Sequence, residues 1–173
     1  MVARNRIWEE LKQAKANIIC LQLYTDKGRR NLRLFNMFVI VIPMLGAVGG
    51  GILDSVIFAV TGASITALVA ALKAILPNLI QSDQELSDLD RLMDFYSKYM
   101  NKLEQIWYKY DTDIISEPEM MDLLFSAKEE ETDKYSLLNK GIRSISKREQ
   151  SKIIEDSINY INKVYFPKPK DNE

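Results

Sequence analysis

The chain of 173 residues has no histidine and only one cysteine, Cys20. The missing imidazole excludes a histidine base and a histidine metal ligand, and a single cysteine excludes an internal disulfide framework. There is also no glycine-rich phosphate loop between a strand and a helix. Asp111 and Asp113 could hold a metal, but two carboxylates at a helix end act more often as turn and capping residues. We therefore expect no enzymatic activity, no catalytic residue, no metal and no cofactor.

Lysine and arginine are absent from residues 34–72, a run of thirty-nine positions whose only formal charge is Asp54. As one helix this run would measure about 58 Å at about 1.5 Å per residue, nearly twice a hydrocarbon core of about 30 Å. The sequence therefore predicts that the run folds back on itself, with the turn at the three glycines 49–51. The expected spans are helices over residues 34–51 and 55–76, because lipid offers no partner to free backbone groups.

Basic residues flank this run on both sides and are missing from its central turn. Lys27, Arg29, Arg30 and Arg33 precede the first expected span, and Lys73 lies at the end of the second. Cytoplasmic flanks of membrane helices carry an excess of lysine and arginine. The sequence therefore predicts a two-span hairpin in the lipid bilayer with both termini in the cytoplasm.

Small residues recur every four positions in both expected spans, and such residues let helices approach closely in lipid. They cover more of the second span than one partner helix needs. We therefore expect copies of the hairpin to form a homo-oligomer, although the same residues could tighten a single hairpin. Lys73 would either reach the interface or form a ring of positive charge at a pore mouth. The candidate pore-lining or packing residues are Gly46, Gly50, Ala59, Thr61, Gly62, Ala63, Ser64, Thr66, Ala67, Ala71 and Lys73.

The rest of the chain carries helical patterns and no strand-like alternation, so the expected fold class is all-α. Residues 82–115 contain a coiled-coil seam with apolar residues spaced by three and four, and residues 1–33 contain a shorter one. We expect these two helices to pair as an antiparallel cytoplasmic stalk that leads into both spans, with Gly28 as a joint. The seam residues are Leu86, Leu89, Met93, Tyr96, Met100, Leu103, Trp107 and Tyr110 in the longer helix and Ile7, Leu11, Ala14, Ile18 and Leu21 in the shorter one.

Residues 116–173 form the last expected region, which is helical with a flexible tail. We expect a short helix through Phe125, an acidic run at 129–131 that acts as a solvated face or linker, and a final helix with an apolar stripe. Capping boxes mark the starts of three helices, because a serine and a glutamate three residues later can satisfy each other's backbone donors. These boxes are Ser82 with Glu85, Ser116 with Glu119, and Ser146 with Glu149.

Five basic residues within thirteen positions make the one candidate ligand site. Basic side chains beside helix amides suit a phosphate, and Tyr135 and Tyr160 are close enough in sequence to stack on a base. The same charges could instead balance the acidic run or contact anionic lipid headgroups. A net charge of −1 gives no general affinity for duplex nucleic acid. The candidate ligand-binding residues are Lys140, Arg143, Lys147, Arg148 and Lys152.

The order of these parts resembles the SLATT family of bacterial proteins. The resemblance covers roughly residues 4–115: an amphipathic helix, a basic collar, a tight two-span hairpin and a heptad helix ending in Leu-Glu-Gln-Ile-Trp at 103–107. It implies a pore-forming effector of antiphage defence in the bacterial inner membrane, whose channel depolarises the cell and causes death or arrest. It also implies a cytoplasmic part that senses a nucleotide or oligonucleotide made by an associated nucleotidyltransferase. The family has no catalytic or pore motif that could be carried over to this chain.

Two other functions fit the same layout. In a membrane-anchored scaffold, the hairpin would be a tether and the cytoplasmic helices would recruit a protein partner. A phage holin or small membrane toxin shares the two spans, but its task needs less cytoplasmic chain than is found here.

Overall fold

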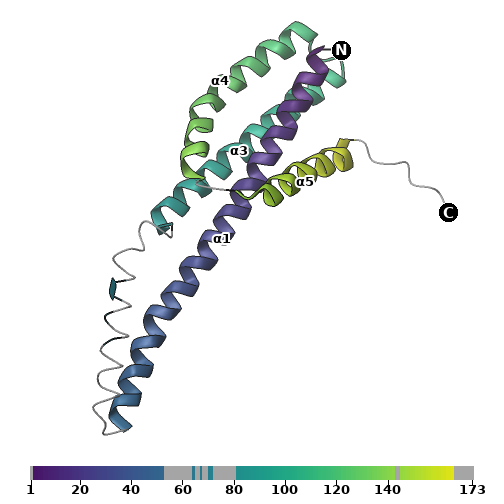
Figure 1. Ribbon diagram of the computed structural model, residues 1–173. Helices are drawn as coiled ribbons and strands as arrows, with labels where there is room; N and C mark the ends of the chain where they lie inside the picture. The colour runs from purple at the N-terminus through teal and green to yellow at the C-terminus, as the bar shows by residue number, and fades with distance from the viewer. Residues whose placement is uncertain are drawn as a thin grey trace, which may run out of the picture. The chain divides into compact units, whose positions relative to one another are not determined.

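The computed structural model describes residues 2–52, 64, 67, 70–71, 81–142 and 145–165. All elements in this part of the chain are α-helices, which confirms the all-α fold class. They are α1 (Val2–Ile52), α3 (Asp83–Asp111), α4 (Glu117–Gly141) and α5 (Lys147–Tyr165), drawn in Figure 1. The chain divides into a first unit, Met1–Tyr24 with Ser87–Glu173, and a second unit, Thr25–Leu86.

Capping boxes begin α3, α4 and α5, as the sequence predicts. In each box the backbone N–H of the serine donates to the carboxylate of the glutamate three residues later, at 2.8–2.9 Å. These bonds satisfy donors that the first helical turn leaves free, so the helix starts are fixed by local chemistry. The three pairs are Ser82 with Glu85, Ser116 with Glu119, and Ser146 with Glu149.

Residues 2–24 of α1 pack antiparallel to α3 in the first unit (Figure 1), which confirms the predicted pairing of the two seams. The ring of Trp8, near the start of α1, lies 4.7 Å from the ring of Trp107, near the end of α3, measured between centroids. The predicted seam residues of both helices are buried, except for three that are only partly buried. These are Ile18, Met93 and Tyr110.

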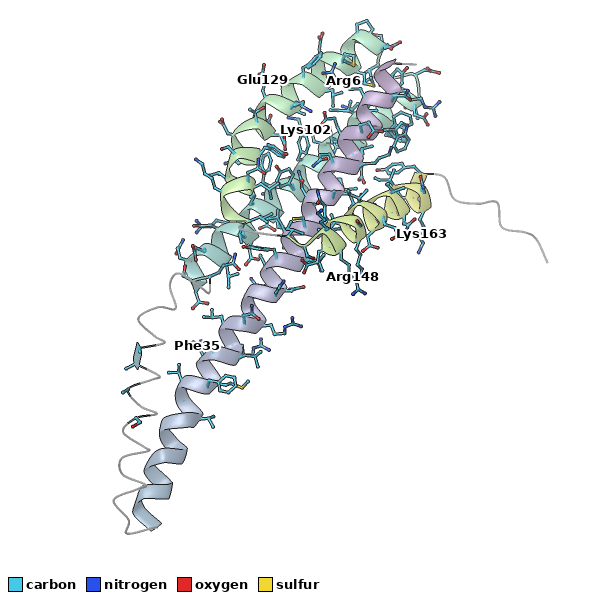
Figure 2. All side chains as sticks on the ribbon, in the orientation of Figure 1. Arg6, Phe35, Lys102, Glu129, Arg148 and Lys163 are labelled. Atoms are coloured by element: carbon cyan, nitrogen blue, oxygen red, sulfur yellow. The ribbon has the colours of Figure 1, made fainter. Side chains whose placement is uncertain are left out.

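Helix α4 continues to Gly141, so it is longer than the predicted short helix. The acidic run, predicted as a solvated face or a linker, is part of this helix, with Glu129 and Glu130 exposed and Glu131 buried. Two glutamates of the acidic run attach α4 to α3 in the first unit. The hydroxyl of Tyr96 donates to buried Glu131 at 2.8 Å, and Lys102 pairs with Glu130 at 2.7 Å (Figure 2 labels Lys102). These contacts were not predictable from the acidic run itself, because Tyr96 and Lys102 both lie on α3.

Polar and cationic contacts also join α4 to α1. The ammonium group of Lys128 donates to the carboxylate of Glu10, and the guanidinium carbon of Arg6 lies 4.7 Å from the ring centroid of Phe125. Helix α4 is therefore held against both α1 and α3 in the first unit.

Helix α5 packs on α1 and α3 with a buried strip of Ile153, Ser157 and Ile161. The apolar stripe predicted for this helix is therefore confirmed in part. Two of its isoleucines, Ile154 and Ile158, remain exposed.

Gly28, which the sequence offered as a joint, lies within α1 in the second unit, and its φ is not positive. A Cβ atom at this position would overlap Gln81 Oε1 and lie 2.7 Å from Leu86 Cδ2. The glycine is therefore explained by close approach of these side chains to α1.

No helix in the part of the chain that the structure describes is both long and apolar enough to cross a membrane. Side chains of the first predicted span, 34–51, are described only as far as Val41. The second predicted span, 55–76, lies outside the described residues apart from 64, 67, 70 and 71, and the predicted tail after residue 165 lies outside them too.

We predict that Tyr96→Phe destabilises the first unit by about 1–3 kcal/mol, because Glu131 then keeps its buried position without the hydroxyl donor. Urea unfolding followed by helical circular dichroism measures the change. Tyr108→Phe removes an exposed phenol from the same helix and should be neutral. Equal effects of both substitutions would contradict the role given to this bond.

Candidate ligand-binding site

The basic residues singled out in the sequence lie at the end of α4 and the start of α5. Lys140 is in the last turn of α4, and Lys147, Arg148 and Lys152 are in the first two turns of α5. All four are exposed, and Figure 2 shows Arg148 extending from α5 into open space. Arg143 lies outside the described residues. The structure therefore places four of the five residues at the end of α4 and the start of α5, and none of the four lines the pocket between α1 and α5.

The first turn of α5 has fewer free hydrogen-bond donors for an anion than the sequence suggested, because its capping box already uses some of them. The backbone N–H of Glu149 donates to the hydroxyl of Ser146 at 3.2 Å, and the Glu149 carboxylate accepts from the Ser146 backbone at 2.9 Å. An incoming phosphate would have to compete with this carboxylate for the helix amides. Exposed basic side chains alone give weak, salt-sensitive attraction to an anion.

The two tyrosines proposed as stacking partners differ in their surroundings. Tyr160 is already covered by a cation, because the ammonium of Lys15 lies 3.6 Å from its ring centroid. Tyr135, on α4, has an exposed ring. One face of the Tyr160 ring is therefore occupied by a cation, and Tyr135 is the more exposed of the two rings.

Most of the candidate pore residues cannot be placed. Gly46 and Gly50 lie in α1. Ser64, Ala67 and Ala71 are helical and exposed. The others, Ala59, Thr61, Gly62, Ala63, Thr66 and Lys73, lie outside the described residues.

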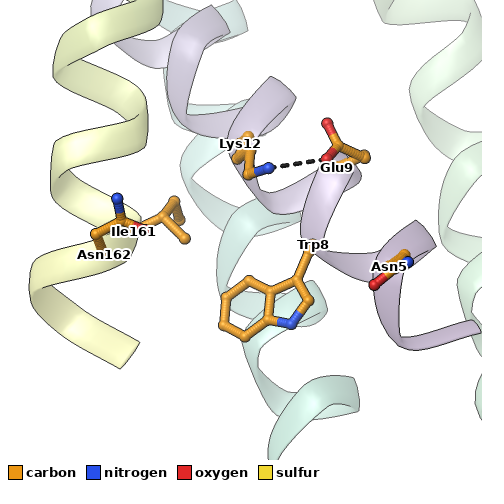
Figure 3. Close-up of a pocket in the computed structure, with 6 residues that line it drawn as sticks. All are labelled: Asn5, Trp8, Glu9, Lys12, Ile161 and Asn162. Carbon is orange, nitrogen blue, oxygen red and sulfur yellow. Dashed lines mark hydrogen bonds and ion pairs between the residues drawn. The ribbon is translucent and has the colours of Figure 1, made fainter. Parts of the chain in front are cut away.

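The sequence did not predict a pocket of about 300 Å³ between α1 and α5 in the first unit (Figure 3). Trp8 forms its wall, and Ile161 reaches it from α5. Polar side chains complete the lining: Asn5, Glu9 and Lys12 from α1 and Asn162 from α5. Both helices therefore contribute to one small site.

Aromatic contacts hold Trp8 in place. Its ring meets Trp107 at 4.7 Å with the planes tilted by 48°, and it meets the edge of Tyr165 at 5.0 Å. Only 9% of the residue is exposed. Rings at these separations attract each other beyond their buried area, so the pocket wall is rigid.

Two of the polar side chains in the pocket are paired with each other, and two have no hydrogen-bond partner among the described residues. Lys12 pairs with Glu9 at 2.8 Å, a contact marked in Figure 3. Asn5 and Asn162 are exposed, and neither carboxamide hydrogen-bonds to another residue that the structure describes. Each therefore presents an unused acceptor and two unused donors to a ligand.

Titratable groups around the same junction are shifted by burial. Burial lowers the pKa of Lys15, and the nearby carboxylate of Glu104 opposes that shift. Burial also raises the pKa of Tyr165, helped by its hydrogen bond to Glu104 at 2.7 Å. Both shifts follow from the burial of these side chains where α5 contacts α1 and α3.

A weak signal for the pocket was present in the sequence. Trp8 directly follows a seam residue, Ile7. Asn5 lies three residues before Trp8 and Lys12 lies four residues after it, so all three share one helix face. The contribution from α5 had no such signal, because Asn162 comes from a distant part of the chain.

Comparison with known proteins gives no relative: no protein-family model, curated protein or solved structure matches the chain significantly.

We predict that the first unit loses helix above about pH 10, the ordinary pKa of tyrosine. Burial raises the pKa values of Tyr96, Tyr99 and Tyr165 above that value, and raises the pKa of Cys20 to about 11. A raised pKa gives stability that is complete below the unfolded pKa and is lost as the pH rises through the folded one. Circular dichroism and phenolate absorbance should therefore change together, whereas titration of every tyrosine near pH 10 with intact helices would count against this view.

Proposed function

We propose that this chain forms an oligomeric ion channel in the bacterial inner membrane, which a nucleotide or oligonucleotide gates from the cytoplasmic side. Opening would depolarise the cell and cause its death or arrest, as an effector of antiphage defence. The apolar surface of α1 at residues 34–41 is the observation that carries the membrane part of this proposal.

Five large apolar side chains in this segment expose 44–61% of their surface. At about 100° per residue they spread over about 160° of the helix, which is wider than the contact with one neighbouring helix. No residue between 34 and 41 is charged. Lipid, or lipid together with other copies of the chain, would remove this surface from water. The side chains are Leu34, Met37, Phe38, Ile40 and Val41.

Three of the predicted packing residues support assembly. Ser64, Ala67 and Ala71 are helical, exposed and spaced by three and four residues, so they share one helix face. Small side chains on one face permit close contact between helices in lipid.

The length of α1 supports mechanical gating. Its 51 residues make a helix of about 77 Å at about 1.5 Å per residue. The first part of this helix supplies core residues of the first unit, such as Leu11, and the later part carries the apolar segment. A ligand that prefers one packing of the first unit can therefore shift the population of channel states by its differential affinity.

Conductance across liposomes containing the full chain tests this proposal, with a panel of cyclic dinucleotides and short oligonucleotides as ligands. We predict that Arg148→Glu combined with Lys152→Glu shifts the ligand response to higher ligand concentrations without changing assembly, because both exposed cations would attract the phosphates weakly. Lys98→Glu with Lys109→Glu makes the same charge change on α3 and should leave the response intact. Liposomes that stay tight with every ligand would refute the channel.

Exposed apolar residues on α5 favour the scaffold as a second candidate. Ile154, Ile158 and Val164 are 37–49% exposed and could contact another protein. In that case, replacing both spans by an unrelated hairpin should preserve function, whereas a channel would lose it.

A further inference from the structure

We propose that the pocket between α1 and α5 binds an adenine base. This inference rests on the proposed function only in taking the bound base to belong to the nucleotide signal. The choice of adenine is argued from the residues that line the pocket, which are Asn5, Trp8, Glu9, Lys12, Ile161 and Asn162.

The size and wall of the pocket suit a single heterocyclic ring. Its volume of about 300 Å³ lies at the lower end of small-ligand sites, so a base with its ribose fits and a longer oligonucleotide does not. Trp8 offers an indole that Trp107 and Tyr165 hold in a fixed orientation. Bases bind such rings through stacking or edge contact, at little entropic cost when the ring is already fixed.

The two unused carboxamides favour adenine over other bases. A side-chain amide pairs with adenine through two hydrogen bonds, one from its NH₂ group to N7 and one from the N6 amine to its oxygen. Asn5 and Asn162 enter the pocket from different helices, and neither is bonded to another described residue. Guanine presents two acceptors at the corresponding positions, so it would leave the amide oxygen unpaired.

The ion pair at the pocket suits the rest of a nucleoside. The carboxylate of Glu9 can accept hydrogen bonds from ribose hydroxyls, and the ammonium of Lys12 can donate to a phosphate. Because Glu9 already neutralises Lys12 at 2.8 Å, we expect the phosphate to add little affinity. A bound nucleoside would contact α1 and α5 together and so favour the state in which α5 is docked.

Intrinsic fluorescence provides a direct assay, because Trp8 and Trp107 are the only tryptophans in the chain and lie side by side. The full chain in detergent micelles is titrated with adenosine, AMP and guanosine. Trp107→Phe leaves Trp8 as the sole reporter. Helical circular dichroism shows whether each variant is folded.

We predict saturable quenching by adenosine and AMP at similar concentrations, and guanosine binding weaker by about tenfold or more. Asn5→Ala and Asn162→Ala should each weaken adenosine binding by about tenfold while the protein stays folded. Asn101→Ala and Asn139→Ala remove exposed amides elsewhere on the first unit and should change nothing.

The proposal is overturned if adenosine causes no saturable quenching, or if guanosine binds as well, or if the pocket variants bind like the controls. These outcomes are separate from the channel test. Conductance without adenosine binding would remove only the base site, and adenosine binding to a protein that leaves liposomes tight would remove only the channel.

Discussion

One uninterrupted helix, α1, contributes residues to both units of the chain. Its first part supplies core residues to the first unit, among them Ile7 and Leu11, and its later part carries large apolar side chains that are 44–61% exposed. The gating proposed above rests on this one helix being shared by both units.

In the first unit, α1 is held by a buried apolar core, and the helices around it are joined by hydrogen bonds between specific pairs of polar side chains. The bond between Tyr96 and Glu131 places a carboxylate in a core position, where leaving it unpaired would be costly. Such hydrogen bonds favour one packing of the helices over others, because a helix that shifts would leave a buried polar group without its hydrogen-bond partner. Helix α5 adds a cation–π contact between the Lys15 ammonium and the Tyr160 ring, and a second hydrogen bond from a tyrosine hydroxyl to a carboxylate, from Tyr165 to Glu104.

Patterns within one segment were predictable from the sequence, and contacts between segments were not. Capping boxes such as Ser146 with Glu149 use residues three apart, and the seam of α3 follows from helical spacing, so both were correct. The buried role of Glu131 was missed, because its partner is thirty-five positions away. The pocket was missed for the same reason: Asn162 meets α1 only after the chain has folded.

The central claim is that residues 34–41 of α1 face lipid, and spin labelling tests it most directly. In a Cys20→Ala background, a nitroxide is attached at Phe38 or, as a control, at exposed Tyr108 in the first unit, and the full chain is placed in liposomes. The account predicts that the label at 38 collides more often with oxygen than with a water-soluble nickel complex, and that the label at 108 shows the reverse. Equal access of the nickel complex to both labels would contradict it.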